Sequence, residues 1–354
     1  MNEDEHPERP PGWWVYRGTG IPAPERADLL PPPPPWREFD GGPLLDDVPA
    51  PPGDRETKRR LGGASTESVP RADIHEVDMV NAALYLRRPL LVTGRPGSGK
   101  SSLAFRIARE LGLGRVLQWP ITSHTTLKTG TYSYDAIGRA HAAGSRSAAA
   151  GSGAGEVAEP PIGDFVRLGA LGTAFLPRRR PRVLLIDELD KSEEELPNDL
   201  LSLFEDGEFE IPELVRMARR TPVVEVFTAD PDSTAEIIGG QVRCHAFPIV
   251  VITSNGERDF PPAFLRRCLR YETKDPDVDQ LAAMVAAHML DPADAHRSRI
   301  IEEFVRRSEA FGGLPVDKLL EAVYLATSGA YRENGASWEQ LMDALWRQLN
   351  SLVS

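Results

Sequence analysis

The chain has 354 residues, of which 41% are hydrophobic and 27% charged, a composition typical of a globular protein with a sizeable core. No apolar run reaches the roughly 18 residues that a membrane span needs, and the net charge of -12 argues against broad binding to nucleic acid phosphates. Two cysteines are too few for a disulfide framework, and the acidic N-terminus is unlike a signal peptide, so we expect a cytoplasmic protein.

Residues 1–70 are predicted to form a proline-rich extension with little regular structure. They hold 15 of the 32 prolines, including the run at 31–35, and such sequences favour polyproline II. The stretch 13–20 (WWVYRGTG) differs, because two adjacent tryptophans form an apolar patch that should dock on another surface. The sequence leaves open whether that surface belongs to this chain or to a partner.

An α/β domain is predicted for residues 71–275. Apolar residues at helical spacing indicate a helix near 77–84 and another at 103–111. Short apolar runs of the kind that form buried parallel strands lie at 90–93, 116–119, 183–186 and 249–252. Alternating strands and helices are typical of a parallel sheet covered by helices.

Two inserts are expected in this domain, near 122–175 and 207–247. The first contains residues 142–155, which are nearly all Ala, Gly and Ser and are predicted to form a flexible loop. From 276 to 354 the pattern is helical, which predicts a small all-helical domain. The helices expected there span 281–290, 300–311, 318–327 and 338–352.

The segment GRPGSGKS at 94–101 satisfies the phosphate-binding pattern GxxxxGK[ST]. Its glycines allow backbone N–H groups to turn towards phosphates, and the following helix directs the positive end of its dipole at them. Lys100 is expected to reach the β- and γ-phosphates, and the Ser101 hydroxyl to hold Mg²⁺. The residues predicted to bind nucleotide here are Gly94, Arg95, Pro96, Gly97, Ser98, Gly99, Lys100, Ser101 and Ser102.

Two acids, Asp187 and Glu188, follow the apolar run at 183–186. Downstream of a phosphate loop, Asp187 would complete the Mg²⁺ shell, usually through water. Glu188 would polarise the attacking water as a general base. The pair indicates a protein that hydrolyses ATP to do mechanical work.

These motifs together resemble those of AAA+ ATPases, which implies a P-loop core followed by a helical lid domain. The set is completed by Asn255 after the run 249–252 and by the segment FLRRC at 264–268. A narrower resemblance to the MoxR-like branch rests on the stretches WPIT (119–122), YSYDA (132–136), LPNDLL (196–201) and GEFEIP (207–212). The stretch 13–20 is similar to the start of MoxR-like ATPases from bacterial conflict-type operons.

The resemblance implies roles for four further residues. Asn255 would orient the attacking water against the γ-phosphate, although an Asn-Gly turn with Gly256 also explains it. Arg266 or Arg267 would be an arginine finger that reaches the γ-phosphate of the next subunit, and the spacing from Phe264 favours Arg267. Lys318 is the candidate for the basic sensor of the helical domain, and a solvated helix lysine is an equal interpretation.

The resemblance further implies an ATP- and Mg²⁺-dependent ring, expected to be a hexamer, that remodels or regulates a partner protein. The implied partners are a von Willebrand A-domain or protease-associated protein; neither a membrane nor nucleic acid is expected. Two alternatives stay open: a nucleic-acid motor or loader of the same architecture, and an ATP-dependent assembly switch with little turnover.

Overall fold

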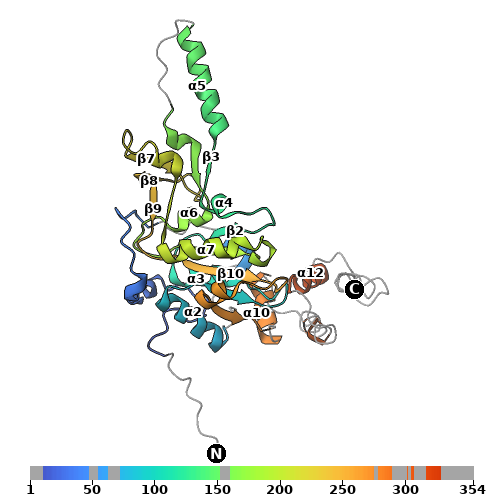
Figure 1. The fold of residues 1–354 in the computed structure, drawn as a ribbon. Helices are drawn as coiled ribbons and strands as arrows, with labels where there is room; N and C mark the ends of the chain where they lie inside the picture. The colour runs from blue at the N-terminus through green and yellow to red at the C-terminus, as the bar shows by residue number, and fades with distance from the viewer. Residues whose placement is uncertain are drawn as a thin grey trace, which may run out of the picture.

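The computed structural model describes residues 11–47, 55–62, 72–151, 160–274, 278–288, 301, 304–306 and 316–327. Its centre is a five-stranded parallel sheet in the order β11-β1-β10-β5-β2 (Figure 1). The strands are β1 Leu90–Thr93, β2 Leu117–Pro120, β5 Val183–Asp187, β10 Ile249–Ser254 and β11 Leu269–Glu272. The predicted α/β class and parallel sheet are therefore confirmed. The strand β11 was not anticipated from the sequence.

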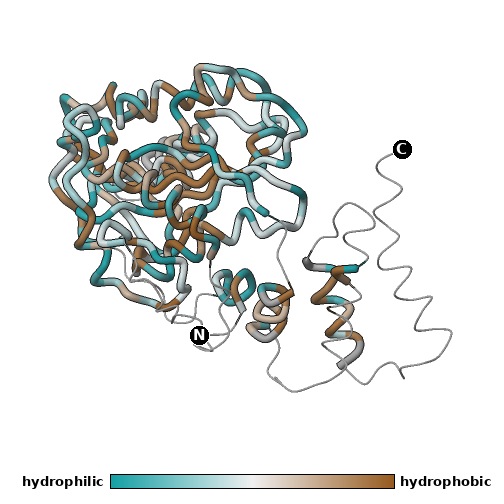
Figure 2. Tube along the Cα trace, turned by 90° about the horizontal axis from the view of Figure 1, so that it is seen from below, coloured by the Kyte–Doolittle hydropathy of each residue, from teal (hydrophilic) through white to brown (hydrophobic). Residues whose placement is uncertain are grey.

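Successive residues of the central strands enter two different hydrophobic cores, because side chains alternate across a sheet. Leu184 and Ile186 of β5 face one core, whereas Val183 and Leu185 face the other. The first core is covered by α6 Ala170–Ala174, α7 Glu195–Asp206 and α9 Pro262–Arg267, and the second by α2 Ile74–Leu86 and α3 Ser102–Leu111. Figure 2 shows the hydrophobic strands enclosed within the body of the molecule.

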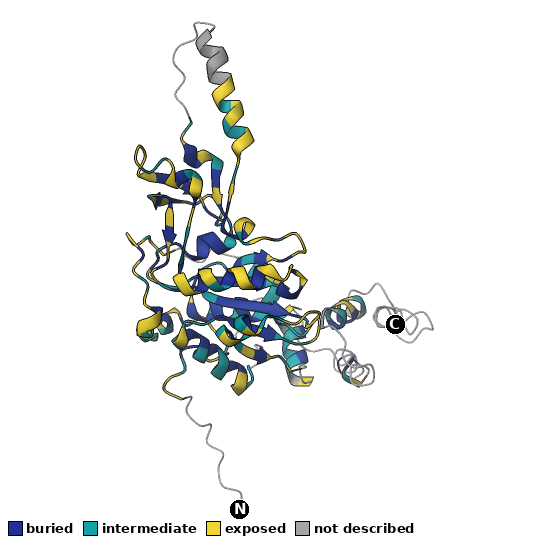
Figure 3. Ribbon diagram, in the orientation of Figure 1, coloured by how far each residue is buried: buried dark blue, intermediate teal, exposed yellow. Residues whose placement is uncertain are grey.

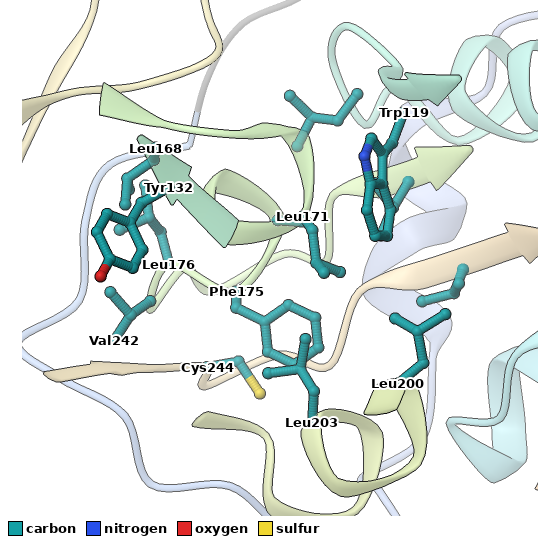
Figure 4. Close-up of a cluster of buried hydrophobic side chains, with 14 of the residues drawn as sticks. Trp119, Tyr132, Leu168, Leu171, Phe175, Leu176, Leu200, Leu203, Val242 and Cys244 are labelled. Carbon is teal, nitrogen blue, oxygen red and sulfur yellow. The ribbon is translucent and has the colours of Figure 1, made fainter. Parts of the chain in front are cut away.

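A second sheet, in the order β3-β4-β7-β8-β9-β6, is built from both inserts. Its strands are β3 Tyr132–Tyr134, β4 Val166–Leu168, β6 Glu208–Glu210, β7 Val223–Phe227, β8 Thr234–Ile238 and β9 Gln241–Arg243. Short helices accompany it: α4 Leu127–Thr131, η3 Ile162–Phe165 and α8 Pro212–Val215. Figure 4 shows Phe175 and Leu171 between Leu203 of α7 and Tyr132 and Val242 of this sheet. The inserts and the nucleotide-binding core thus share one hydrophobic interior.

The prediction of a flexible loop at 142–155 is wrong for residues 142–151, which belong to helix α5 Ala136–Gly151. Alanine has the highest helix propensity, and that preference outweighs the few glycines and serines here. The Asp135 carboxylate also supports the start of the helix by accepting a hydrogen bond from the Gly138 N–H at 2.8 Å. Helix α5 projects from the body, and its described side chains are mostly exposed (Figures 1 and 3). Residues 152–159 lie outside the described part of the chain.

Residues 11–47, which we call the N-terminal strap, fold along the core without strands of their own apart from one isolated bridge. The strap contains the short helices η1 Pro24–Leu29 and η2 Pro35–Arg37. Val15 and Tyr16 are buried in the core formed by α2 and α3. Their backbone N–H groups donate to the Asn81 side chain at 2.8 and 3.0 Å. The tryptophan-containing stretch therefore docks on this chain's own core.

A buried carboxylate, Glu110 of α3, holds the strap next to that stretch. It accepts hydrogen bonds from the backbone N–H groups of Arg17, Thr19 and Gly20 at 2.7, 2.8 and 3.1 Å. Arg26 adds an ion pair at 3.1 Å. Four donors on one fully buried carboxylate make this a strong attachment point, because hydrogen bonds to charged groups are about twice as strong as neutral ones.

Three helices complete the described part: α1 Arg55–Leu61, α10 Val278–His288 and α12 Val316–Thr327. Helix α1 lies in the extension that the sequence predicts as largely irregular. Its Arg59 carbonyl lies 3.3 Å from the His288 ring of α10. The helix expected at 338–352 lies outside the described residues, and of 300–311 only 301 and 304–306 are described, all helical. Among the described helices, none has the length and apolarity needed to cross a membrane.

Candidate nucleotide site

The predicted site residues gather at the carboxyl edge of the central sheet. The strands β1, β10 and β5 lie side by side, and Thr93 is in register with Ser254. Because parallel strands all end at one edge, the loop after β1 meets Asp187 at the end of β5 and Asn255 after β10. The sheet order therefore explains how segments about 160 residues apart form one site.

The phosphate loop runs from β1 into α3. Gly94 has a φ of +145°, and a Cβ there would lie 2.1 Å from the Thr273 hydroxyl, so only glycine fits. Gly99 has a φ of +80°, and a Cβ there would meet nothing within 4 Å. The backbone at Gly99 therefore borders open space and leaves room for a ligand to approach it. Ser98 is tied to the residue after β11 by a 2.7 Å hydrogen bond with Thr273.

Lys100 is nearly buried and its ammonium faces the loop. Its Nζ donates to the carbonyl oxygens of Gly94 and Arg95 at 2.8 and 2.6 Å. Burial lowers the pKa of Lys100, while the nearby Asp190, Asp187 and Glu188 act to raise it. An ammonium held by two carbonyl oxygens can exchange them for phosphate oxygens, so this residue fits a nucleotide.

Asp187 and Ser101, the predicted Mg²⁺ residues, are in direct contact. The Ser101 hydroxyl donates to Asp187 Oδ1 at 2.6 Å, and the Thr253 hydroxyl donates to the same oxygen at 2.7 Å. A carboxylate and hydroxyls are hard oxygen donors of the kind that Mg²⁺ prefers. The residues present therefore fit the ion.

Thr253 was not identified from the sequence. It is buried in β10, and its hydroxyl also accepts a hydrogen bond from the Glu188 N–H at 2.8 Å. One side chain thus links both acids at the end of β5 to the neighbouring strand. The signal in the sequence was a polar residue directly after the apolar run 249–252. When β10 pairs with β5, this residue lies opposite the acids.

Glu188 has a left-handed backbone conformation, with φ +63° and ψ +50°. Its half-exposed carboxylate forms an ion pair with Lys191 at 2.7 Å, and this hydrogen bond raises the pKa of Lys191. Lys191 was not identified from the sequence. Its position three residues later, in the helix η4 Leu189–Lys191, was the available signal.

Asn255 is fixed through its backbone by a buried acid that the sequence analysis missed. Asp190 Oδ2 accepts hydrogen bonds from the N–H groups of Asn255 and Glu257 at 2.8 and 3.1 Å. Gly256 has a φ of +78°, so the Asn-Gly turn is present. Asn255 also follows β10 at the carboxyl edge of the sheet, and its role as the sensor stays a prediction.

Arg266 and Arg267 lie at the end of α9, next to the start of β11. Leu269 of β11 pairs with Leu90, the first residue of β1, so these arginines are at the amino edge of the sheet. The four residues of β1 span about 13 Å, and the phosphate loop lies beyond their other end. Arg267 forms an ion pair with Glu205 at 2.6 Å, and Arg266 Nε donates to the Pro262 carbonyl at 3.2 Å.

Lys318, the predicted sensor of the helical domain, is located in α12. Its Nζ forms an ion pair with Glu321 at 2.8 Å, three residues further along the same helix. Such an intrahelical pair is what a surface lysine commonly makes. The role of Lys318 in nucleotide binding stays a prediction.

Similarities to known proteins identify the family of this chain. Among solved structures, NtrX from Brucella abortus in complex with ADP is 12% identical with a TM-score of 0.38, covering 80% of this chain and 57% of NtrX. The chain thus spans little more than half the length of NtrX. PCH-2 from C. elegans is 13% identical, with a TM-score of 0.38 and coverage of 88% and 78%. No curated protein sequence matches the chain.

A family model described as an AAA domain of the dynein-related subfamily matches residues 89–268. The matched segment is more than half of the chain and contains the phosphate loop, both acids after β5, Asn255 and the two arginines. The chain therefore belongs to the AAA domain family, in its dynein-related subfamily.

Proposed function

We propose that this AAA protein is a MoxR-like ATPase that hydrolyses ATP, assembles into a ring and remodels or regulates a partner protein in the cytoplasm. Membership of the AAA family implies nucleotide binding, and the family generally hydrolyses ATP. The observation that carries the proposal is the cluster of Ser101, Asp187 and Thr253 with Glu188 beside the phosphate loop.

The chemistry follows from the residues in this cluster. Lys100 and the loop N–H groups bind the phosphates, and Ser101 and Asp187 would hold Mg²⁺, which supplies positive charge against the β- and γ-phosphates. Glu188 accepts a proton from the attacking water at its carboxylate, and Asn255 orients that water. Each of these residues follows a strand of one rigid sheet, which keeps the geometry fixed.

The position of the arginines supports a ring. Arg266 and Arg267 are at the amino edge of the sheet, about 13 Å or more from the phosphate loop of their own chain. An arginine there serves a phosphate only on another copy. Each nucleotide site is then completed by its neighbour, which is the arrangement that the arginine-finger prediction requires.

The projecting helix α5 supports a protein client. Ile137 near its start is 71% exposed, and the helix extends away from the body (Figure 3). A helix that extends from the body is accessible to another protein. We propose a von Willebrand A-domain or protease-associated protein as the client class.

A second candidate function is an ATP-dependent assembly switch with little turnover. It is favoured by the ion pair between Glu188 and Lys191, because a base held by a cation is a weaker proton acceptor. Under this alternative the chain assembles on binding ATP and hydrolyses it slowly. The two candidates share the site and differ in rate.

Substitution of Glu188 tests the proposal. Glu188→Gln should bind ATP normally and hydrolyse it about 10²–10⁴ times more slowly, because the amide cannot take the proton from water. Steady-state hydrolysis and calorimetric ATP affinity measure the two effects. The matched control, Glu236→Gln on the exposed face of β8, should leave both unchanged. Wild-type turnover in Glu188→Gln would contradict the assigned base.

A further inference from the structure

A cavity of about 260 Å³ lies among η4, the start of α7 and the segment after β10. Its charged lining consists of Asp190, Glu193, Glu194, Arg258 and Asp259, and we call this cavity the Asp190 pocket. Sites for drug-sized ligands have volumes of roughly 300–1,000 Å³, so this smaller cavity is suited to one long side chain or a group of similar size.

The carboxylate of Asp190, in the wall of the pocket, is only half satisfied. Asp190 is 3% exposed, and its Oδ2 accepts the N–H groups of Asn255 and Glu257. Its buried Oδ1 has no hydrogen-bond partner among the residues that the structure describes. A buried charged group without a donor is costly, and in native proteins such a group commonly marks a ligand, an ion or a water. The wall of the pocket is therefore prepared for a donor.

The cations of this region are bound to other groups. Lys100 donates to two carbonyl oxygens of the phosphate loop, and Lys191 pairs with Glu188. Arg258, which itself lines the pocket, donates to the Ser192 carbonyl at 2.6 Å. None of the four carboxylates that line the pocket forms an ion pair with a described residue. A cation from outside the chain therefore has no internal competitor.

The pocket stays negative when its neighbours are counted. Four carboxylates and one guanidinium line it, Glu257 adds a further negative charge, and Lys191 and Glu188 cancel each other. The positive end of the α7 dipole accounts for the acids at the start of that helix. It does not account for Asp190 and Asp259, which lie on other segments.

Apolar side chains form the remaining wall. Leu189 and Pro197 are buried, and the half-buried Phe260 has its ring 5.5 Å from that of Phe264. The methylene stems of lysine and arginine pack along such surfaces, and an aromatic ring attracts their charged ends. A metal ion would not use these walls. Within the described ranges, no three Asp, Glu, His or Cys side chains are placed to hold one.

We propose that the Asp190 pocket binds a lysine or arginine side chain of the partner protein. The charged end would lie against the Asp190 carboxylate, between Glu193 and Asp259, and the stem against Phe260. The inference rests on the proposed function for the existence of a partner. It adds the chemistry by which the partner is recognised, a basic segment with a side chain long enough to enter the pocket.

A peptide with a single arginine between glycines, blocked at both ends, is the probe. The same peptide with citrulline in place of arginine is its control, because citrulline keeps the shape and loses the charge. Saturation-transfer NMR with the full chain, without nucleotide, measures both dissociation constants. The arginine peptide should bind about tenfold more tightly or better, since hydrogen bonds to charged groups are the stronger ones.

Substitutions locate the peptide. Asp190→Asn should weaken binding of the arginine peptide about tenfold, while its amide oxygen still accepts the two backbone N–H groups, so the melting temperature should change little. The double variant Glu193→Gln/Asp259→Asn changes only exposed side chains and should weaken binding about threefold, even if Asp190→Asn does not fold. Glu236→Gln, on the exposed face of β8, is the matched control and should bind as the wild type does.

Several results would overturn the inference. These are no binding of the arginine peptide, equal affinity for the arginine and citrulline peptides, and equal affinity in the wild type and the double variant. Spermidine that binds more tightly than the arginine peptide would replace the partner protein by a free polyamine. Binding is measured without nucleotide, so it is independent of hydrolysis. A chain that binds the arginine peptide and does not hydrolyse ATP would overturn the proposed ATPase and leave the pocket in place.

Discussion

Thr253 is hydrogen-bonded to both acids of the candidate site, Asp187 and Glu188. Its hydroxyl donates to Asp187 and accepts from the Glu188 N–H, so it holds both the side chain of Asp187 and the backbone of Glu188. The side chain is almost completely buried, and water cannot replace either bond. A hydroxyl suits this position because its single oxygen both donates and accepts.

Thr253→Val should therefore lower hydrolysis about tenfold to a hundredfold, because loss of a hydrogen bond to a charged group costs about 1.5–3 kcal/mol. Valine has nearly the same shape, so packing is preserved. Turnover measured across a Mg²⁺ titration checks the prediction, and Thr253→Ser should restore most of the activity. Equal turnover in the valine and threonine chains would mean that Asp187 and Glu188 are positioned without this hydroxyl.

Substitution of Lys191 distinguishes the two proposed functions, an ATPase that remodels a partner and an assembly switch with little turnover. A half-exposed ion pair contributes about 0.2–1 kcal/mol, so Lys191→Met should raise turnover by up to about fivefold by releasing Glu188. Lys191→Arg keeps the charge and should remain close to wild type. An unchanged rate in Lys191→Met would remove the observation that favours a slow assembly switch.

Helix α3 connects the phosphate loop to the N-terminal strap. It begins at Ser102 next to the loop and carries Glu110 near its other end, where the strap is bound. The strap covers apolar side chains of α2 and α3, including Val77 and Leu103. It therefore acts as a structural layer of the AAA core as well as a surface segment.

Glu110→Gln should lower the free energy of unfolding by about 2 kcal/mol or more. The backbone N–H groups of the strap bind both carboxylate oxygens, and the amide replaces one of these acceptors by an NH2 donor. The ion pair with Arg26 is also lost. Urea denaturation measures the change. Glu236→Gln, which is exposed, serves as the control and should shift the midpoint little. A midpoint unchanged in Glu110→Gln would show that the strap is held by its apolar contacts alone.

The elements that the sequence predicted well are those whose signals are local. The phosphate loop, the strands at 90–93 and 183–186 and the acids after them are each recognisable within a few residues. Thr253 and Asp190 were missed because their roles arise from the pairing of β10 with β5 and from the turn after β10. Lys191 was missed because its pair with Glu188 depends on the turn of η4, which the sequence did not predict.

Two further differences between the sequence predictions and the structure have physical causes. Strand β11 has only four residues, and just one of them is buried, so it shows little apolar pattern. The glycines and serines among residues 142–155 favour a loop, whereas the helix propensity of the alanines prevails in 142–151, the part of this segment that belongs to α5.

At the scale of the whole molecule, the two candidate finger arginines, Arg266 and Arg267, lie in different environments. Arg267 is bound to Glu205, whereas Arg266 is exposed on the same helix end. A guanidinium already paired with a carboxylate is less available for a phosphate. Within the proposed ring, this difference favours Arg266 as the arginine that would serve the neighbouring copy.

Arg266→Ala should leave ATP affinity nearly intact and reduce turnover about 10³–10⁵-fold, the effect of arginine fingers in other P-loop enzymes. Arg267→Ala should reduce turnover less. Mixing Arg266→Ala with Glu188→Gln should restore part of the activity, because some interfaces then combine an intact base with an intact arginine. No recovery, together with activity strictly proportional to concentration, would mean that each chain works alone.

The separation of the arginines from the phosphate loop, at opposite edges of one sheet, also determines how many sites an assembly can use. In the proposed ring, each copy would give an arginine on one side and receive one on the other, so a linear row of copies would always have one site without an arginine. A pair of chains then has half of its sites complete, and only closure into a ring completes all of them. Specific activity should therefore rise in a final step at the size where the ring closes, and that step would reveal the number of copies.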